Sequence, residues 1–167
     1  MSERQGLRVS GVSECHSPLL EQLVELEAAA FGRGGMNEWF LPAFMKHGAV
    51  FVLWHNDRPV GVAECMRDWN HPSEVYLFGL SLEASARGKG WGRLFLTRIC
   101  AILAERGFTQ VSLTVSPRNR AGLRLYRRLK FRIVAYLPNE YGPGEHRFLM
   151  RKRLLHVRTK GVKQDRG

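Results

Sequence analysis

The stretch SARGKGWGRLFL, from Ser85 to Leu96, places three glycines at alternate positions and then continues into an apolar, helix-like segment. Glycine lets backbone N–H groups approach a ligand closely, and the N-terminus of a helix adds partial positive charge. The basic side chains of Arg87, Lys89 and Arg93 add to that charge. The stretch therefore predicts a phosphate-binding loop at the start of a helix.

Two common phosphate-binding motifs do not fit this stretch. A Walker loop requires Ser or Thr directly after its lysine, whereas Lys89 is followed by Gly90. A dinucleotide-binding fingerprint requires a third glycine where Arg93 stands, and an acidic residue in the region that reads VSLTVS. We therefore expect the loop to bind a phosphate compound of another kind.

The segments on either side of the loop predict a βαβ unit. EVYLFGLSL, residues 74–82, is an apolar run typical of a strand buried on both faces, and TQVSLTVS, residues 109–116, predicts a second strand. Between them, apolar residues recur at helical spacing up to Gly107. Strands joined in this way pair in parallel, so the loop lies at the C-terminal end of the first strand.

The remaining segments predict further strands and helices around this unit. Residues 17–31 predict an amphipathic helix, and MNEWFLPAFMKHG, residues 36–48, predicts a shorter helix broken near Pro42. Turn residues at 56–59 predict a hairpin. Strand patterns occur at residues 7–13, 49–56, 59–69, 131–138 and 146–154. The predicted fold class is α/β, with one mixed, mostly antiparallel sheet flanked by helices.

Length and composition are typical of one globular domain. The chain has 167 residues, of which 44% are apolar, and we expect one domain over residues 1–155 followed by a basic, flexible tail over residues 156–167. Cys15, Cys65 and Cys100 are far apart, which indicates a reducing compartment rather than a disulfide or zinc framework. With no pattern of a signal peptide or membrane span, we expect a cytoplasmic protein without a metal or a membrane partner.

The formal net charge of +11 is concentrated near the C-terminus, where residues 151–167 hold seven Lys and Arg against Asp165. A basic tail attracts nucleic acid or is a solvated terminus. The tail has no interleaved aromatic residues and no RNA- or DNA-binding motif is visible, so we do not expect nucleic acid as a partner. The sequence leaves open whether the chain forms a homodimer.

The loop and a later segment together resemble the GNAT superfamily of N-acetyltransferases. The loop fits the family's R/Q-x-x-G-x-G/A motif from Arg87 to Gly92, and NRAGLRLYRRLKF, residues 119–131, is similar to its N-x-x-A-x-x-L-Y-x-x-x-G-F motif. Two residues depart from the second motif: Gly122 replaces alanine, and Lys130 replaces the glycine before the phenylalanine. We therefore expect this helix to end without its usual left-handed cap.

The resemblance implies that the loop binds the pyrophosphate of acetyl-CoA. It also implies that the strand before the loop diverges from its parallel partner and offers backbone groups to the pantetheine arm. Asn119 would cap its helix, and whether it also contacts the cofactor stays open. The positions of this chain that match the family's cofactor site are Leu80, Ser81, Leu82, Arg87, Gly88, Lys89, Gly90, Trp91, Gly92, Arg93 and Asn119.

The reaction implied by the resemblance is direct transfer of the acetyl group to a primary amine of a small molecule, peptide or protein. Tyr126 would protonate the departing thiolate, because a tyrosine of ordinary pKa near 10 holds its proton at neutral pH. Its alternative role is packing in the core. Backbone groups near residues 80–82 would stabilise the oxyanion. The general base stays open among Tyr76, Glu64, Asp68, Glu140 and solvent.

Several side chains allow two interpretations. Glu64, in the apolar strand GVAEC, either has a role in the site or is exposed on the polar face of the hairpin. Tyr141 and Glu145 in the turn NEYGPGE either line the acceptor mouth or, as we prefer, form a solvated turn. Thr114 stands where protein N-terminal acetyltransferases of the superfamily often carry Glu or His, which disfavours a protein N-terminus as acceptor.

Two other functional classes are kept as alternatives to an amine acetyltransferase. The first is a non-catalytic module that binds and senses acyl-CoA, and the second is a basic protein associated with nucleic acid. Tyr126 favours the enzyme over the sensor, because a sensor needs no acid for a leaving group.

Overall fold

The computed structural model describes residues 5–14 and 16–155, and the predicted tail at 156–167 and Cys15 lie outside these ranges. The strands are β1 (Leu7–Val12), β2 (Ala49–His55), β3 (Arg58–Arg67), β4 (Glu74–Leu82), β5 (Gln110–Val115), β6 (Arg132–Leu137) and β7 (Arg147–Arg153). The helices are α1 (Ser17–Phe31), α2 (Phe40–His47), α3 (Trp91–Glu105) and α4 (Arg120–Arg128), with single-turn helices η1 (Gly32–Gly34) and η2 (Ala84–Ala86).

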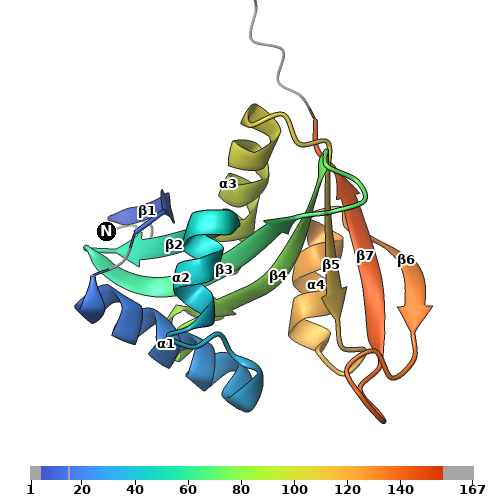
Figure 1. Ribbon diagram of the computed structural model, residues 1–167, viewed down its shortest axis with the longest axis horizontal. Helices are drawn as coiled ribbons and strands as arrows, with labels where there is room; N and C mark the ends of the chain where they lie inside the picture. The colour runs from blue at the N-terminus through green and yellow to red at the C-terminus, as the bar shows by residue number, and fades with distance from the viewer. Residues whose placement is uncertain (1–4, 15, 156–167) are drawn as a thin grey trace, which may run out of the picture.

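The seven strands form one sheet in the order β1-β2-β3-β4-β5-β7-β6 (Figure 1). Every neighbouring pair is antiparallel except β4 and β5, which are parallel and connected through α3. The predicted single domain, with a mixed and mostly antiparallel sheet and one βαβ unit, is therefore confirmed. Asn56 and Asp57 form the predicted hairpin turn, and both have the positive φ that a tight two-residue turn requires.

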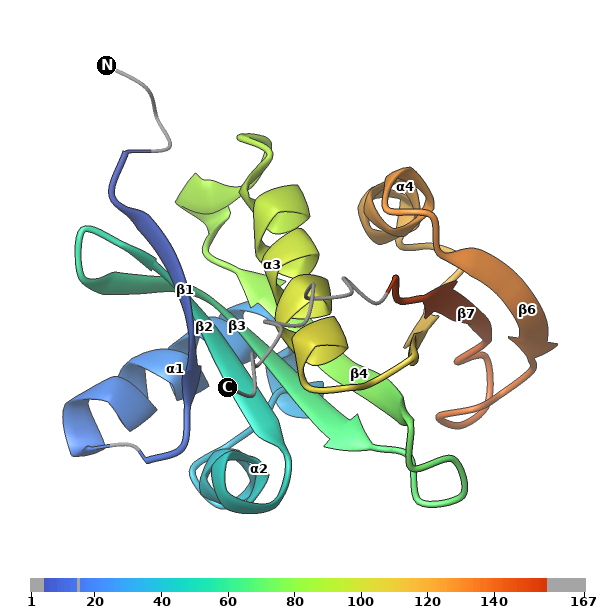
Figure 2. The ribbon, with the colours of Figure 1, turned by 90° about the horizontal axis from the view of Figure 1, so that it is seen from above.

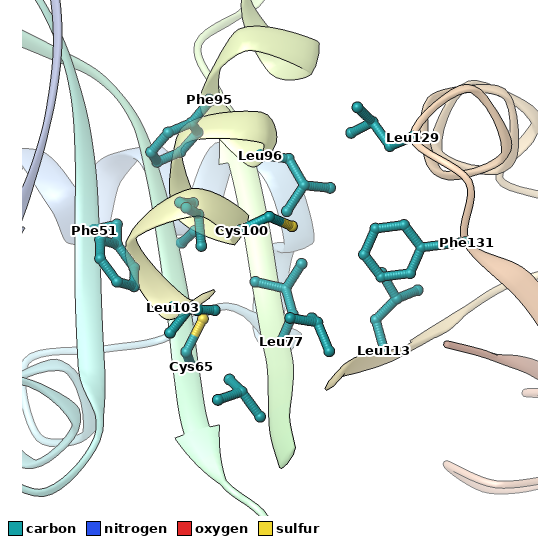
Figure 3. Packing of buried hydrophobic residues seen from close by; sticks show 14 of the residues in the cluster. Phe51, Cys65, Leu77, Phe95, Leu96, Cys100, Leu103, Leu113, Leu129 and Phe131 are labelled. Atoms are coloured by element: carbon teal, nitrogen blue, oxygen red, sulfur yellow. The ribbon is translucent and has the colours of Figure 1, made fainter. Parts of the chain in front are cut away.

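Helices cover both faces of the sheet, and each face has its own apolar core (Figure 2). Successive residues of β2 point to opposite faces, so Val50 and Val52 pack under α1 and α2, whereas Phe51 packs under α3. The larger core lies between the sheet, α3 and α4, where Phe95 and Phe131 are buried (Figure 3). None of the helices within the described ranges is long and apolar enough to cross a membrane.

The second helix differs from its prediction at Pro42. Instead of a helix from residue 36 broken by proline, α2 begins at Phe40, after the Asn37 side chain accepts hydrogen bonds from the N–H groups of Trp39 and Phe40 at 3.0 and 3.1 Å. Pro42 then lies in the first turn, where its missing N–H costs no hydrogen bond. The predicted break is therefore wrong, because the proline belongs to the start of the helix.

The end of α4 also differs from its prediction. Lys130 adopts the left-handed conformation, with φ of 68°, and Phe131 N–H donates to the carbonyl of Tyr126 at 3.0 Å. The Lys152 ammonium donates to the carbonyl of Leu129 at the same helix end. A left-handed cap therefore forms without glycine, at a cost of roughly 1–2 kcal/mol for the side chain of Lys130.

Two carboxyl groups are buried in the core beneath α1. Glu27 is 1% exposed and Glu64 is 0% exposed, so the interpretation of Glu64 as a surface residue is wrong. One oxygen of Glu27 accepts the N–H of Met36 at 3.1 Å. Within the described residues, its other oxygen, both oxygens of Glu64 and the Ser81 hydroxyl have no hydrogen-bond partner. A Cβ on Gly79 would lie 2.6 Å from Glu64 Oε2, so the carboxylate occupies the space of the missing side chain.

Burial shifts the titration of this pair. Loss of hydration raises the pKa of both carboxyl groups, and repulsion from Glu27 raises the pKa of Glu64 further. The folded protein therefore binds more protons than the unfolded chain over a pH range that begins near the ordinary carboxyl value of 4.5. Stability falls as the pH rises through this range, because the buried groups must ionise.

Glu64→Gln is expected to raise the melting temperature at pH 8 and to flatten the loss of stability between pH 5 and pH 8. The amide keeps the shape of the side chain and removes its ionisation. Each gain of about 1 kcal/mol corresponds to ~2–4 °C in a domain of this size. Thermal unfolding across pH measures the effect, with Glu25→Gln, at an exposed position of α1, as the control of equal charge. Parallel pH profiles for wild type and Glu64→Gln would contradict the expectation.

Candidate active site

The sheet opens between its two parallel strands. β4 pairs with β5 from Glu74 to Leu77, and no described residue of β5 pairs with β4 beyond that point. On the other edge of β4, Leu77 and Gly79 lie opposite consecutive residues of β3, so Phe78 forms a bulge. A bulge bends its strand, and β4 and β5 diverge from here (Figure 1). The predicted divergence of the parallel pair is confirmed.

The prediction that the strand at residues 74–82 is buried on both faces is wrong at the bulge. Phe78 is 43% exposed, and its ring lies 5.6 Å from that of Phe44 in α2. Beyond it, β4 keeps hydrogen bonds to β3 through Leu80, Ser81 and Leu82, but its other edge faces the opening. Backbone groups at that edge are available to an extended ligand, and residues 80–82, for which the resemblance implies this role, lie there.

The glycine loop follows β4 and leads directly into α3. Gly88 and Gly90 both have φ of 77°, a conformation that residues with a Cβ rarely adopt. A Cβ on Gly92 would lie 3.2 Å from a methyl group of Leu82, so glycine here lets α3 approach β4 closely. The first N–H bonded within α3 is that of Leu94. The N–H groups of the three residues before it have no helical acceptor and are free to bind an anion.

The side chains of the loop have different surroundings. Arg87 is exposed, and its Nε donates to the carbonyl of Leu82 at 3.1 Å, which fastens the loop to the end of β4. Lys89 is exposed above the ring of Trp91, 5.1 Å from its centroid. Trp91 itself is 4% exposed and packs in the core, where its ring supports the Lys89 side chain of the loop. Arg93 is exposed on the first turn of α3.

Helix α4 supplies the two candidate residues of the second motif. Asn119 caps the helix, because its Oδ1 accepts the N–H of Gly122 at 2.8 Å. A Cβ on Gly122 would lie 2.8 Å from Asn119 Nδ2, so the cap rests directly on this glycine. Tyr126 is half-buried with its ring 5.8 Å from Phe131, and within the described residues no hydrogen bond contributes to its titration. Burial raises the pKa of Tyr126 to about 12, so the hydroxyl is protonated at neutral pH.

Three hydroxyl groups meet at the start of the opening, on the face of the sheet covered by α1 and α2. Tyr76 Oη lies 2.8 Å from Thr114 Oγ1 and 3.2 Å from Tyr141 Oη, and the last two lie 3.2 Å apart. They come from β4, β5 and the loop between β6 and β7. The Tyr141 side chain therefore reaches the candidate site, and the preferred interpretation of NEYGPGE as only a solvated turn is wrong for this residue.

Tyr141 is the functional candidate whose placement the sequence did not reveal. Its loop lies far from Tyr76 in the chain, and no local pattern indicates that β7 returns beside β5 and brings the loop to the opening. Arg147 lies 4.8 Å from the Tyr141 ring centroid and also pairs with Glu145 at 3.0 Å. Glu145 is thus engaged in an exposed ion pair.

The structure separates the four side chains considered as general bases. Tyr76 lies in the hydroxyl cluster, and burial raises its pKa, so the hydroxyl keeps its proton. Glu64 lies under α1 beside Gly79. Asp68 lies in the turn before β4, at the opposite end of this strand from the glycine loop, and hydrogen bonds led by that from the His71 N–H lower its pKa. Glu140 is exposed next to Tyr141.

The opening has two different sides. Helices α3 and α4 lie on one face of the sheet, and α1 and α2 lie on the other (Figures 1 and 2). Tyr126 packs in the core beneath α3 and α4. Tyr76, Thr114 and Glu64 alternate along their strands with residues of that core, so the hydroxyl cluster and Glu64 lie on the opposite face. An extended molecule held by the loop can reach between β4 and β5 and meet a second molecule from the opposite face. This arrangement suits a transfer between two substrates.

Known structures share this architecture. The ribosomal-protein-S18-alanine N-acetyltransferase from Escherichia coli superposes with a TM-score of 0.75 at 19% identity, over 93% of this chain and 99% of that one. Naa50 from Arabidopsis thaliana, in complex with the bisubstrate analogue CoA-Ac-MVNAL, gives a TM-score of 0.73 at 20% identity. The match covers 88% of this chain and 98% of that one. An aminoglycoside 6'-acetyltransferase type Ii gives a TM-score of 0.76 at 20% identity, over 89% of this chain and 97% of that one.

A search of curated protein sequences finds no match to this chain. At identities this low, the structural similarities establish the fold and leave the acceptor open. The sequence model of the acetyltransferase (GNAT) family, however, matches residues 17–131, which include the glycine loop, the diverging strands and α4. The chain therefore belongs to the acetyltransferase (GNAT) family.

Proposed function

We propose that the chain transfers the acetyl group of acetyl-CoA directly to a primary amine. The observation that carries the proposal is the opening between β4 and β5, with an anion-binding loop on one face of the sheet and a hydroxyl cluster on the other. The acetyl donor enters from the side of α3 and α4, and the amine enters from the side of α1 and α2.

The residues at the loop fit the phosphate and pantetheine parts of acetyl-CoA. Free N–H groups of Trp91, Gly92 and Arg93 point from the start of α3, as a pyrophosphate requires. Exposed Arg87 and Lys89 add charge-assisted hydrogen bonds. The open edge of β4 offers backbone groups to the amides of the pantetheine arm. The Asn119 side chain, already used as a helix cap, contributes to the rim of this channel.

Residues of the chain supply the groups that acetyl transfer needs. Bound acetyl-CoA supplies an activated thioester. Backbone N–H groups at the open edge of β4, near residues 80–82, stabilise the negative charge that develops on the carbonyl oxygen. Tyr126, protonated because of its raised pKa, donates a proton to the departing sulfur. Its hydroxyl is available for this, because burial alone, and no hydrogen bond within the described residues, sets its titration.

The hydroxyl cluster on the other face orients the amine. Tyr76 and Tyr141 keep their hydroxyl groups within hydrogen-bond distance of each other and of Thr114, so an amine can replace one of these contacts. The face is open to water at Tyr141, which is 54% exposed. We assign removal of the amine's proton to solvent or to exposed Glu140, whose charge acts on Tyr76. Asp68 is distant, Glu64 is buried beneath α1, and the hydroxyl of Tyr76 keeps its own proton.

Exposed aromatic side chains around the opening favour an amine that carries an apolar group. Phe31 and Phe78 are 44% and 43% exposed, and Phe31 approaches the space beside Gly79. Both side chains lie on the face of the sheet that α1 and α2 cover, which is the acceptor side. Apolar surface that stays uncovered in the free protein is typical of a ligand site. Small amines and peptide amines with such a group both fit this description.

The location that we propose is the cytoplasm, where acetyl-CoA and reduced thiols occur together. Cys65 and Cys100 are free and buried, in keeping with a reducing compartment.

A panel of amines incubated with acetyl-CoA tests the proposed function. Free thiol release would be followed for small apolar amines, polyamines, aminoglycosides and short peptides with unblocked N-termini. We expect release above the rate of hydrolysis for at least one amine that has an apolar neighbour. Binding of acetyl-CoA without release for any acceptor would instead support the acyl-CoA sensor.

The double substitution Arg87→Glu/Lys89→Glu is expected to weaken acetyl-CoA binding at least several-fold. Both residues are exposed beside the free N–H groups of α3, so reversing their charge places repulsion where the phosphates bind. Calorimetry measures the affinity. Lys46→Glu/Arg98→Glu, two exposed positions away from the loop, is the control with the same change of charge. Equal losses in both double variants would contradict the assignment of the loop.

Tyr126→Phe is expected to lower turnover by about 10²–10⁴-fold and to leave acetyl-CoA affinity nearly unchanged. The ring keeps its contact with Phe131, and only the proton donor is lost. Turnover is measured on the best acceptor of the panel under conditions where chemistry limits the rate. Tyr136→Phe, at an exposed tyrosine of β6, is the matched control. Wild-type turnover in Tyr126→Phe would make Tyr126 a packing residue.

A further inference from the structure

A long groove lies between α3 and the unit formed by the end of α4 with β6 and β7. Figure 2 shows the backbone of these elements from above. It has a volume of about 1310 Å³. Along α3 it follows one helix face from Arg93 through Thr97 and Ala101 to Glu105. Twelve residues of helix correspond to ~18 Å, so the groove extends well beyond the glycine loop at the start of α3.

The groove is lined by seven basic residues and one acidic residue, Glu105. The basic residues come from three separate parts of the chain. Within the described ranges, no salt bridge joins any of them to a carboxylate. Six are exposed and Lys152 is half-buried. The basic residues are Arg93, Arg128, Lys130, Arg132, Arg151, Lys152 and Arg153.

The charge of the two helical layers is opposite in sign. Helix α1, on one face of the sheet, exposes Glu21 and Glu25 and contains no basic residue. Helix α4, on the other face, contains four arginines and no acidic residue. This polarity concentrates positive potential around the groove and directs a negatively charged partner to this face.

The C-terminal tail of the chain is unsuited to fill the groove. Residues 156–167 contain four Lys and Arg against Asp165, so the tail is itself basic. Leu155, the last described residue, lines the groove. The basic groove and the basic tail repel each other, and both attract a negatively charged partner. The occupant must come from outside the chain and carry many negative charges.

The shape of the groove selects among polyanions. Its basic residues line a concave surface, whereas a membrane presents its headgroups to a convex or flat surface. A groove of this length can follow the sugar-phosphate backbone of one extended strand. No aromatic residue lines it, so stacking on the bases contributes little and phosphate contacts dominate. Such binding is independent of base sequence and depends strongly on salt.

We propose that the groove between α3, the end of α4, β6 and β7 binds single-stranded nucleic acid through its phosphate backbone. The sequence expectation of no nucleic-acid partner rested on the tail, which lacks aromatic residues, and on the absence of a recognisable RNA- or DNA-binding motif. Only the folded chain brings basic residues from α3, α4 and β7 to one surface. The proposal does not depend on the identity of the amine acceptor or on acetyl transfer.

Fluorescence anisotropy of a labelled 20-nucleotide polyuridine RNA with the full chain, over a series of KCl concentrations, tests the proposal. The groove variant Arg128→Gln/Lys130→Asn/Arg132→Gln removes three charges, and asparagine suits the left-handed conformation of residue 130. Arg98→Gln/Arg124→Gln/Arg127→Gln removes three charges from exposed residues of α3 and α4 that do not line the groove. Thermal unfolding and acetyl-CoA affinity verify that both variants are folded.

We expect the groove variant to bind at least tenfold more weakly at low salt, while the control stays within about threefold of wild type. A plot of log K against log salt has a negative slope, and its steepness should decrease by about 2 in the groove variant. Each phosphate contact to a single strand contributes ~0.7 to this slope, and three contacts are lost. Equal losses in both variants, or no loss in either, would overturn the proposal and point to overall charge or the tail. Release of the RNA by saturating acetyl-CoA would assign the groove to the cofactor.

A parallel measurement with vesicles of phosphatidylcholine and 30% phosphatidylserine distinguishes a lipid partner. The proposal requires the groove variant to lose RNA binding. If the groove variant instead loses only vesicle binding and keeps RNA binding, the groove serves an anionic membrane surface and the proposal is wrong.

Discussion

The end of hydrogen bonding between β4 and β5 is the constraint on which the site depends. The parallel ladder stops at Leu77 and Leu113, and the bulge at Phe78 turns β4 away from its neighbour. An open edge in the middle of a sheet leaves backbone groups without partners, which is costly unless a ligand satisfies them. The loop, the tyrosine of α4 and the hydroxyl cluster all lie around this one discontinuity.

Much of this architecture is predictable from local sequence, because helices and strands have different apolar periods and the two motifs are contiguous. The failures concern contacts between distant segments. Exposure of Phe78 depends on where β5 leaves β4, and burial of Glu64 depends on a glycine of the next strand. The left-handed Lys130 is possible because Phe131 is anchored in the core, which no propensity indicates.

The distribution of charge shows the same limit of local sequence. Counting residues identifies the basic C-terminal segment but not the surface that it joins. Arg132 and Arg151 are 19 positions apart in the chain and are register partners on β6 and β7. The pairing of strands, rather than the order of residues, brings positive charge together beside α3. Electrostatic predictions from sequence therefore become specific only after the topology is known.

The contact between Glu64 and Gly79 constrains how this chain can vary during evolution. The carboxylate occupies the volume that a side chain at residue 79 would need, with only 2.6 Å to the position of a Cβ. A homologue that acquires alanine or a larger residue at 79 must also shorten or redirect residue 64. The two positions are therefore expected to covary among homologues. Lineages with an acid at 64 beneath the opening should keep glycine at 79, and lineages with a larger residue at 79 should lack the acid.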